Sequence, residues 1–325
     1  MVFVHIKTES VDGEKMVRKT KKLIFKGDLY VSDATGHRLS FSLRNNVRNP
    51  RNICDLEKVP SLEGVYFANI YDKIFIKLLK AKELAEDPSY SHASEKLEDY
   101  KKTLISHDAG SSWESIEPPK IDKNGVPFKC NHKCSLHLHM FSSEDITRLY
   151  SLKNTVGLIV AHGNVDSHLS KRSIGVFLSR SGGRFWKHIA YGKHVYEIGN
   201  HGGLIVIASV EGPTNEVQYS LDFGENWETY FFSKKKILVK NILMESTNSH
   251  YRFLITGSIG DSGHGVSILL DFSSMHLRKC EGFQTPENQK SDFEFFTPKN
   301  QDFGKCFLGR KVKYIRRRAS SMCWI

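Results

Sequence analysis

The sequence lacks an apolar run that approaches the roughly 20 residues of a membrane-spanning helix. Residues 1–7 contain only a short apolar stretch, and no small-residue cleavage site follows it, so a signal peptide is not expected. No Asn-x-Ser/Thr sequon for N-glycosylation is present either. Taken alone, these absences favour a cytosolic protein.

Recognisable catalytic and nucleotide-binding motifs are also missing. There is no nucleophile elbow, no glycine-rich phosphate loop and no spaced set of arginines on the expected inward strands. The net charge of +11 suggests a nucleic-acid partner, but the basic residues are scattered, with unbroken triplets only at 234–236 and 316–318. We therefore expect no enzyme activity, no cofactor, no bound metal and no nucleic-acid partner.

What the sequence does contain is a repeat. Three eight-residue stretches, at 106–113, 179–186 and 220–227, follow the pattern Ser-x-Asp-x-Gly-x-x-Trp, except that Ser181 replaces the aspartate in the second. The residues that define the three boxes are Ser106, Asp108, Gly110, Trp113, Ser179, Gly183, Trp186, Ser220, Asp222, Gly224 and Trp227.

The chemistry of the pattern is that of a hairpin turn. A serine or aspartate side chain in a tight turn accepts hydrogen bonds from backbone N–H groups, and glycine permits a positive φ. The tryptophan can fold back and bury its ring beneath the hairpin. This is the Asp-box, which recurs once per blade in some β-propellers. We therefore expect an all-β fold in which the boxes are structural rather than catalytic.

The spacing of the boxes agrees with one box per blade. Trp186 and Trp227 lie 41 residues apart, close to the usual length of a four-stranded blade. Trp113 and Trp186 lie 73 residues apart, which predicts an insertion that holds Cys130 and Cys134. Apolar, β-branched segments predict strands at 157–161, 204–208, 253–256 and 266–270. Residues 90–102 fit either a helix or a solvated loop.

The last 46 residues differ in composition from the rest. From residue 280 the apolar strands give way to glycine, proline, asparagine, aromatic residues and three of the six cysteines, which predicts a domain boundary near residue 279. Clustered cysteines are typical of disulfides in an oxidising compartment, in conflict with a cytosolic location. Zinc ligation near Cys130 by His132, His137 and His139 is the alternative, but it lacks the paired, regular spacing of structural zinc sites.

Several longer motifs resemble one family. Residues 129–139 resemble its C-x(n)-C-S-L-H-L-H signature, and residues 154–165 are similar to its AVGIVIAHGNVG strand. Residues 62–66 match its LxGVY strand, and residues 292–294 with 304–310 resemble the DYE…GKCLLG start of its cysteine-rich module. The family is that of the Vps10 domain of sortilin-type sorting receptors, and the fungal vacuolar sorting receptors are the most similar.

The resemblance implies a specific architecture. The family fold is a ten-bladed β-propeller followed by two small disulfide-rich modules, a membrane span and a cytosolic tail. Residues 1–279 are then expected to form the last four to five blades of such a propeller, and residues 280–325 an incomplete cysteine-rich module. On this basis we expect a truncated member of the family, whose open end blades make it marginally stable and prone to aggregation.

The resemblance also implies the disulfides. Cys130 is expected to pair with Cys134, and Cys280 with Cys323. Cys306 would pair with a downstream cysteine that this sequence lacks, and Cys54 lies where the family usually has none. Both are therefore expected to be unpaired.

The function implied by the resemblance is non-enzymatic peptide binding. Such receptors carry vacuolar hydrolases of the carboxypeptidase Y type, recognised through peptides or propeptides, from the late Golgi to the prevacuolar endosome. Tyr30, Ser32 and Tyr66 align with residues that line the peptide tunnel, although ordinary strand packing explains the two tyrosines equally well. The family's basic anchor for a ligand carboxylate falls near Phe41.

Three hypotheses remain open. The chain is either a working receptor fragment or a truncated relic that retains the fold without sorting function. An Asp-box glycosidase of the sialidase type is the third hypothesis, although the boxes alone do not supply its nucleophile or its arginine cluster. A Golgi and late secretory location follows from the resemblance, whereas the missing segments leave a cytoplasmic location open. Membrane association would require those segments.

Overall fold

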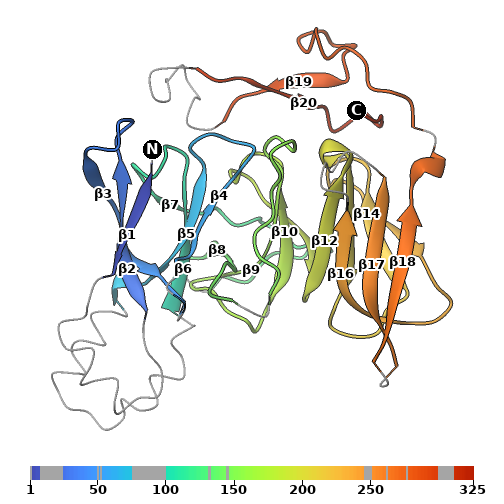
Figure 1. Ribbon diagram of the computed structural model, residues 1–325, viewed down its shortest axis with the longest axis horizontal. Helices are drawn as coiled ribbons and strands as arrows, with labels where there is room; N and C mark the ends of the chain where they lie inside the picture. The colour runs from blue at the N-terminus through green and yellow to red at the C-terminus, as the bar shows by residue number, and fades with distance from the viewer. Residues whose placement is uncertain are drawn as a thin grey trace.

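The protein is a curved row of antiparallel sheets with a small module lying across it (Figure 1). The computed structural model describes residues 2–7, 25–49, 51, 53–74, 100–130, 133–143, 146–244, 251–260, 263–275, 277–298 and 311–325. The prediction of an all-β fold built from propeller blades is confirmed.

We number the sheets as blades 1 to 5 from the N-terminus. Blade 1 contains β1 (Phe3–Lys7), β2 (Lys26–Ser32) and β3 (Leu39–Val47). Blade 2 contains β4 (Leu56–Lys58), β5 (Tyr66–Tyr71), β6 (Lys101–Ser106) and β7 (Glu114–Ser115). One backbone pairing, between Asn46 of β3 and Ile70 of β5, joins these two blades into a seven-stranded sheet.

The next three blades form separate sheets. Blade 3 contains β8 (Ser135–Leu138), β9 (Ile159–Asp166), β10 (Gly175–Ser179) and β11 (Lys187–Tyr191). Blade 4 contains β12 (His194–Gly199), β13 (Leu204–Ser209), β14 (Glu216–Ser220) and β15 (Glu228–Phe231). Blade 5 contains β16 (Leu238–Met244), β17 (Arg252–Ile259) and β18 (His264–Asp271). Short 3-10 turns follow β12, at Asn200–Gly202, and β18, at Ser273–Met275.

The core lies between the blades. Successive side chains of a strand point to opposite faces, so a strand with blades on both sides must be apolar at nearly every position. In β13, Leu204 and Val206 pack against blade 5, whereas Ile205 and Ile207 pack against blade 3. All four side chains are at most 1% exposed. This two-sided burial explains why the blade strands appear in the sequence as continuous apolar runs.

The strands predicted at 157–161, 204–208, 253–256 and 266–270 correspond to β9, β13, β17 and β18. Strand β9 begins two residues later than predicted because Gly157 adopts a positive φ of 77° in the preceding turn. The helical interpretation of 90–102 is wrong at its end, since Lys101 and Lys102 begin β6 and pair with β5. Residues 90–99 lie outside the described residues.

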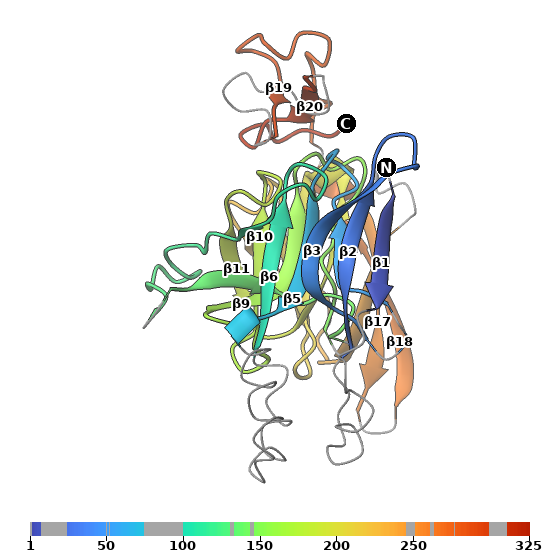
Figure 2. The same ribbon diagram turned by 90° about the vertical axis from the view of Figure 1, so that its left-hand side faces the viewer.

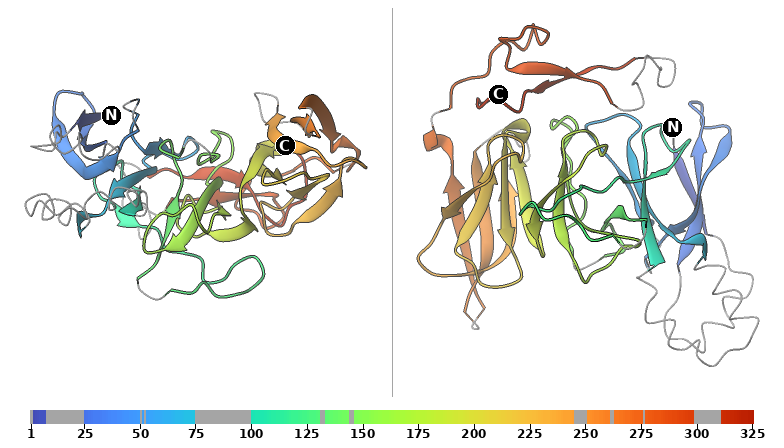
Figure 3. Two further views of the ribbon diagram at one scale, coloured as in Figure 1. Left: turned by 90° about the horizontal axis from the view of Figure 1, so that it is seen from below. Right: turned by 180° about the vertical axis from the view of Figure 1, so that it is seen from behind.

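The C-terminal residues form a small module with a two-stranded sheet of β19 (Phe293–Phe296) and β20 (Tyr314–Arg317). Figure 2 shows this sheet lying above the blades, at one end of their strands. Seen from below, the blades follow a curve, with blade 1 and blade 5 at its opposite ends (Figure 3). In the part of the chain that the structure describes, no helix is both long enough and apolar enough to cross a membrane.

Candidate functional site

Each Asp-box forms the turn between the third and fourth strands of its blade. In the first box, the Ser106 hydroxyl accepts the N–H of Gly110 at 2.8 Å, and the Asp108 carboxylate accepts the N–H of Ser112 at 2.8 Å. Gly110 has φ +85°, and a Cβ there would lie 2.7 Å from the ring of Phe3. Both the conformation and the space therefore require glycine.

The third box repeats this geometry. Ser220 accepts the N–H of Gly224 at 2.8 Å, and Asp222 accepts the N–H groups of Glu225 and Asn226 at 3.0 and 2.9 Å. The Trp227 indole donates to the carbonyl of Gly224 at 3.2 Å. The carboxylate is thus engaged within its own turn.

The second box shows how serine replaces aspartate. The Ser181 hydroxyl accepts the N–H of Phe185 at 2.7 Å. In the other two boxes the aspartate accepts the equivalent N–H, four residues later in the sequence. The glycine at the positive-φ position is Gly183, and the indole of Trp186 donates to its carbonyl at 2.9 Å. In the first box the equivalent indole of Trp113 instead donates to Ser42 of β3 at 3.0 Å, which ties blade 2 to blade 1.

Among the described residues the structure contains two disulfides, Cys130–Cys134 and Cys280–Cys323. Cys54 is a free cysteine, and burial raises the pKa of its thiol. Cys306 and His132 lie outside the described residues.

The histidines near Cys130 are used in other ways. His137 accepts the backbone N–H of Thr103 at 3.0 Å, and His139 forms a hydrogen bond with the Ser143 hydroxyl at 2.8 Å. Among the described residues, neither imidazole joins the cysteine pair in a cluster that suits a metal ion.

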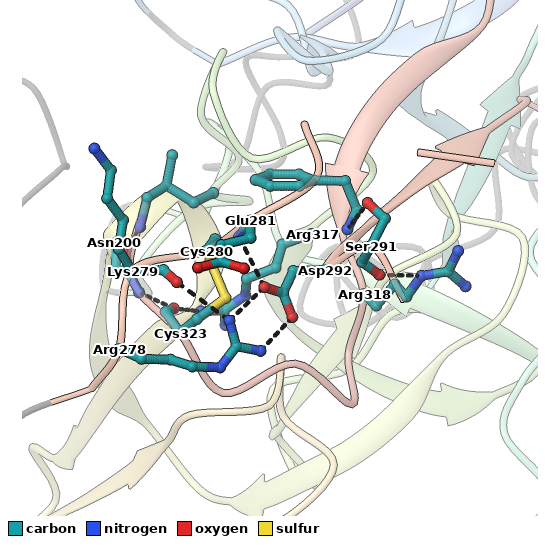
Figure 4. Close-up of a disulfide and its surroundings, with 12 residues drawn as sticks. Asn200, Arg278, Lys279, Cys280, Glu281, Ser291, Asp292, Arg317, Arg318 and Cys323 are labelled. Atoms are coloured by element: carbon teal, nitrogen blue, oxygen red, sulfur yellow. Dashed lines mark hydrogen bonds and ion pairs between the residues drawn. A yellow bond between two sulfur atoms is a disulfide. The ribbon is translucent and has the colours of Figure 1, made fainter. Parts of the chain in front are cut away.

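The Cys280–Cys323 disulfide lies beside an ion pair between Arg278 and Asp292 (Figure 4). Both guanidinium nitrogens of Arg278 donate to the Asp292 carboxylate at 2.6 Å, and the N–H of Glu281 donates to it at 2.8 Å. The hydrogen bonds from Arg278 hold the pKa of Asp292 well below its usual range. The disulfide joins the two ends of the module, and the ion pair ties the residue before the module boundary to the residue before β19.

Strand β20 attaches the module to three blades in succession. The Tyr314 hydroxyl accepts the N–H of Glu63 in blade 2 at 3.0 Å, and Arg316 donates to the carbonyl of Arg180 in the second Asp-box. Arg317, only 2% exposed, donates to the carbonyl of Leu221 in the third Asp-box at 3.1 Å. Two of these three contacts are therefore made to Asp-box turns.

Arg317 is the most buried of these contacts. Its guanidinium lies 4.9 Å from the centre of the Phe223 ring, in cation–π geometry. Gly203 makes room for it, because a Cβ there would approach the guanidinium to 2.2 Å. Burial lowers the pKa of Arg317 to about 10, so the group remains charged at neutral pH.

The three residues expected to line a peptide tunnel all lie beside the first strand. The Tyr66 ring packs on Phe3 of β1, with ring centres 4.7 Å apart. Tyr30 lies directly opposite Val4 in the β1–β2 ladder. The buried Ser32 hydroxyl accepts the N–H of the residue before β1, Val2, at 2.7 Å.

These residues do not form one pocket. Phe3 pairs with Val31, so both lie on the face of blade 1 that packs against Tyr66. Tyr30 is next to Val31 in sequence and points to the opposite face, where its ring packs on Phe41 at 5.7 Å. The expected tunnel residues are thus divided between two faces of blade 1, with β1 between them.

The feature shared by these residues is the edge of β1. Among the described residues, β1 pairs with β2 alone, so its other edge is open. The N–H of Ser32 donates to the Val2 carbonyl at 2.8 Å, which identifies Val2 as a residue that turns its backbone groups toward β2. By the alternation of an antiparallel ladder, the backbone groups of Phe3 and His5 point to the open edge.

The basic anchor expected near Phe41 is only partly matched. Phe41 itself is 49% exposed, and the guanidinium of Arg44 lies 5.3 Å from the centre of its ring. Arg38 is exposed in the turn between β2 and β3. The guanidinium of Arg44 therefore lies against the aromatic residue at the expected anchor position, and Arg38 precedes that residue by three positions in sequence.

Comparison with known proteins relates this arrangement to one family. The family model described as "Sortilin, neurotensin receptor 3" matches residues 3–242, and the model of the sortilin C-terminal region matches residues 244–325. The vacuolar protein sorting/targeting protein 10 of Mycosarcoma maydis is 31% identical over 328 residues, which cover 100% of this chain and 20% of that protein. An uncharacterized membrane glycoprotein of Saccharomyces cerevisiae is also 31% identical, with 100% and 27% coverage.

The solved structures that resemble the chain are more distant. An ancestral GH74 enzyme covers 82% of this chain and 32% of its own length at 12% identity, with a TM-score of 0.35. The NanB sialidase of Streptococcus pneumoniae covers 77% and 36% at 12% identity, with a TM-score of 0.30. These values are too low to support any statement about activity. The family is shown by the sequence, because two family models together match nearly every residue: the chain belongs to the sortilin and Vps10 family.

Proposed function

We propose that this chain is the peptide-binding part of a non-enzymatic sorting receptor, which recognises extended segments such as the propeptides of vacuolar hydrolases. The open edge of β1 carries the proposal. An extended peptide can add to such an edge as a further strand, with main-chain hydrogen bonds supplying affinity and alternate side chains supplying specificity. Tyr30, Ser32 and Tyr66, the residues aligned with the family's tunnel, all contact or pair with this same part of the chain.

The state of the carboxylates supports the absence of enzyme activity. Asp108 and Asp222 accept hydrogen bonds from backbone N–H groups inside their turns, which leaves them badly placed to act as acids or nucleophiles. We therefore retain the non-enzymatic assignment and set the glycosidase hypothesis aside.

The proposed domain division follows the packing. We place the boundary at residue 279, after blade 5 and before the Cys280–Cys323 disulfide, so that residues 1–279 are the propeller part and residues 280–325 the cysteine-rich module. The family models meet instead between residues 242 and 244, within β16 of blade 5. We further propose that the receptor works in the late secretory pathway, between the Golgi and the endosome, as part of a longer membrane protein.

A substitution in β1 tests the peptide site. His5→Pro removes an N–H that points to the open edge and leaves the bonds to β2 in place, because proline is tolerated on the free side of an edge strand. His5→Ala is the matched control, since it removes the same imidazole and keeps the N–H. Binding of a fluorescent hydrolase propeptide is measured by anisotropy, after circular dichroism has verified the fold.

We expect wild type and His5→Ala to bind the peptide, and His5→Pro to bind at least about tenfold more weakly, because one strand-pairing hydrogen bond is lost and its peptide carbonyl is left unpaired. Equal binding by the two variants would contradict pairing at β1. A folded wild-type chain that binds no propeptide would contradict the receptor proposal and favour a relic.

A further inference from the structure

The two disulfides among the described residues differ in how easily a reagent can reach them. Cys130 is exposed and lies in the segment between β7 and β8, which extends outward from the row of blades (Figure 3). Its partner, Cys134, is partly buried. In the other disulfide, Cys323 is completely buried and Cys280 is partly buried. Thiol–disulfide exchange begins when a thiolate attacks one sulfur atom, so access favours reaction at Cys130.

Backbone contacts hold Cys280 and Cys323 together independently of their sulfur atoms. The N–H of Cys280 donates to the carbonyl of Trp324 at 2.8 Å, and the N–H of Trp324 donates to the carbonyl of Arg278 at 2.9 Å. The side-chain amide of Asn200 donates to the Cys323 carbonyl at 3.2 Å. Two thiols that are held in this way stay close together after reduction, so each has a high effective concentration near the other and the closed disulfide is favoured.

The Cys130–Cys134 disulfide restrains much less of the chain. Its two cysteines have a sequence separation of 4 residues, whereas those of the Cys280–Cys323 disulfide have a separation of 43. A bridge that closes a small loop removes little conformational freedom from the unfolded chain. Opening the Cys130–Cys134 bond therefore costs the fold less than opening the other disulfide.

Other contacts attach the inserted segment to blade 3. The Tyr191 hydroxyl of β11 donates to the Asp122 carboxylate, and the N–H of Lys123 donates to the imidazole of His188 at 3.1 Å. The ring of Phe128 packs on the same imidazole, with ring centres 5.7 Å apart. Because these contacts involve neither cysteine, we expect the segment to stay attached when the disulfide opens.

The charges near the two disulfides also differ. Lys129 and Lys133, both exposed, each precede one cysteine of the exposed pair. A nearby cation stabilises a thiolate, which is the group that leaves when the disulfide is attacked. At the buried disulfide, a carboxylate oxygen of Asp292 lies within 4.8 Å of both sulfur atoms. The neighbouring cation, Arg278, is already paired with that carboxylate at 2.6 Å.

We propose that Cys130–Cys134 is an exchangeable disulfide and that Cys130 is modified by small thiols such as glutathione. A glutathione thiolate attacks the Cys130 sulfur, the bond to Cys134 breaks, and Cys134 leaves as a thiolate that takes a proton from solvent. Cys130 then carries glutathione as a mixed disulfide. A second glutathione thiolate attacks the sulfur of the bound glutathione, which releases oxidised glutathione and leaves Cys130 as a thiol. Two small thiols thus supply the two electrons that reduce the protein disulfide.

The experiment exposes the folded chain to glutathione at neutral pH. Buffers with increasing ratios of reduced to oxidised glutathione are brought to equilibrium with the protein, free thiols are blocked, and the chain is digested. Mass spectrometry then measures the fraction of each disulfide that is open and locates every glutathione adduct. Circular dichroism verifies the fold in each buffer. The Cys280–Cys323 disulfide is the internal control, because it experiences the same buffer in the same molecule.

We expect the Cys130–Cys134 disulfide to be half reduced at a ratio at least about tenfold less reducing than the Cys280–Cys323 disulfide requires, with the circular dichroism spectrum unchanged. Two variants form a matched pair for the site of attack. With oxidised glutathione, Cys134→Ser should gain an adduct at Cys130 at least about fivefold faster than Cys130→Ser gains one at Cys134, because Cys130 is the more exposed residue.

Three results would overturn the proposal. If both disulfides open at the same ratio, or if Cys280–Cys323 opens first, access and loop size do not control the exchange. If Cys130–Cys134 opens only where the circular dichroism spectrum of the fold is lost, the bond is a structural one. If the two serine variants gain their adducts at equal rates, Cys130 is not the preferred site of attack.

Discussion

Acid is expected to destabilise this fold through histidines that join neighbouring blades. The imidazole of His162 in blade 3 accepts the backbone N–H of His194 in blade 4 at 2.9 Å. The imidazole of His137 in blade 3 accepts the N–H of Thr103 in blade 2 at 3.0 Å. A nitrogen that accepts a hydrogen bond cannot also carry a proton, so protonation of either imidazole breaks a bond between blades.

The size of the effect follows from the pKa values. Burial lowers the pKa of both His137 and His162 from 6.5 to about 4. For His162, the nearby His194 and Lys193 oppose a further positive charge, whereas the carbonyl of Thr147 favours one. Because the folded pKa is the lower one, each neutral imidazole stabilises the fold fully above pH 6.5, and this contribution is lost progressively as the pH falls toward about 4. At pH 5 the loss is about 2 kcal/mol for each histidine.

Urea unfolding at pH 7.5 and pH 5.0, followed by tryptophan fluorescence, measures this loss. The two histidines together should remove about 4 kcal/mol, a large part of the stability of an ordinary domain. His162→Gln retains an acceptor for the His194 N–H but cannot be protonated, so its pH difference should be smaller by about 2 kcal/mol. His37→Gln, at an exposed turn, is the control. The reasoning is refuted if wild type and His162→Gln lose the same stability between the two pH values.

Three further predictions concern the turns and the module. Gly203→Ala should release the module by displacing Arg317, and hydrogen exchange should then increase across residues 311–325, unlike in a variant at an exposed site. Serine at both Cys280 and Cys323 should lower the free energy of unfolding by about 4 kcal/mol, because the bridge closes a loop with a sequence separation of 43 residues; an unchanged denaturation midpoint would contradict this. Ser181→Asp should restore the complete box and stabilise the protein by about 0.5 to 1 kcal/mol, measured as an increase in Tm.

The repeat made most of the fold predictable from sequence. Each box has a polar side chain that accepts backbone N–H groups and a glycine at a positive φ, and both are local requirements visible in eight residues. Given one box per blade, the apolar runs between boxes could only be strands buried on two faces. The conformation of Lys101 and Lys102 differs from the prediction because it is set by pairing with β5 and not by a local preference.

The site was less predictable because the contacts of its residues are made with residues that are distant in sequence. Tyr30 and Tyr66 are the expected tunnel residues, but which face of blade 1 each lies on or packs against depends on the β1–β2 register. The role of His162 depends on a backbone N–H 32 residues away. Neither the face that a tyrosine occupies nor the partner of His162 can be predicted from the spacing of residues in the sequence. The triplet at 316–318, dismissed as a nucleic-acid signal, contains the two arginines that attach β20 to the Asp-boxes.

This attachment ties the module to the middle of the row. Strand β20 contacts blades 2, 3 and 4 through Tyr314, Arg316 and Arg317 in turn, so it spans their successive turns on one side. Because β20 is hydrogen-bonded to three neighbouring blades on one side of the row, it restricts how far these blades can rotate apart. Loss of the module contact, as in Gly203→Ala, should therefore also increase hydrogen exchange in the strands of blades 2, 3 and 4.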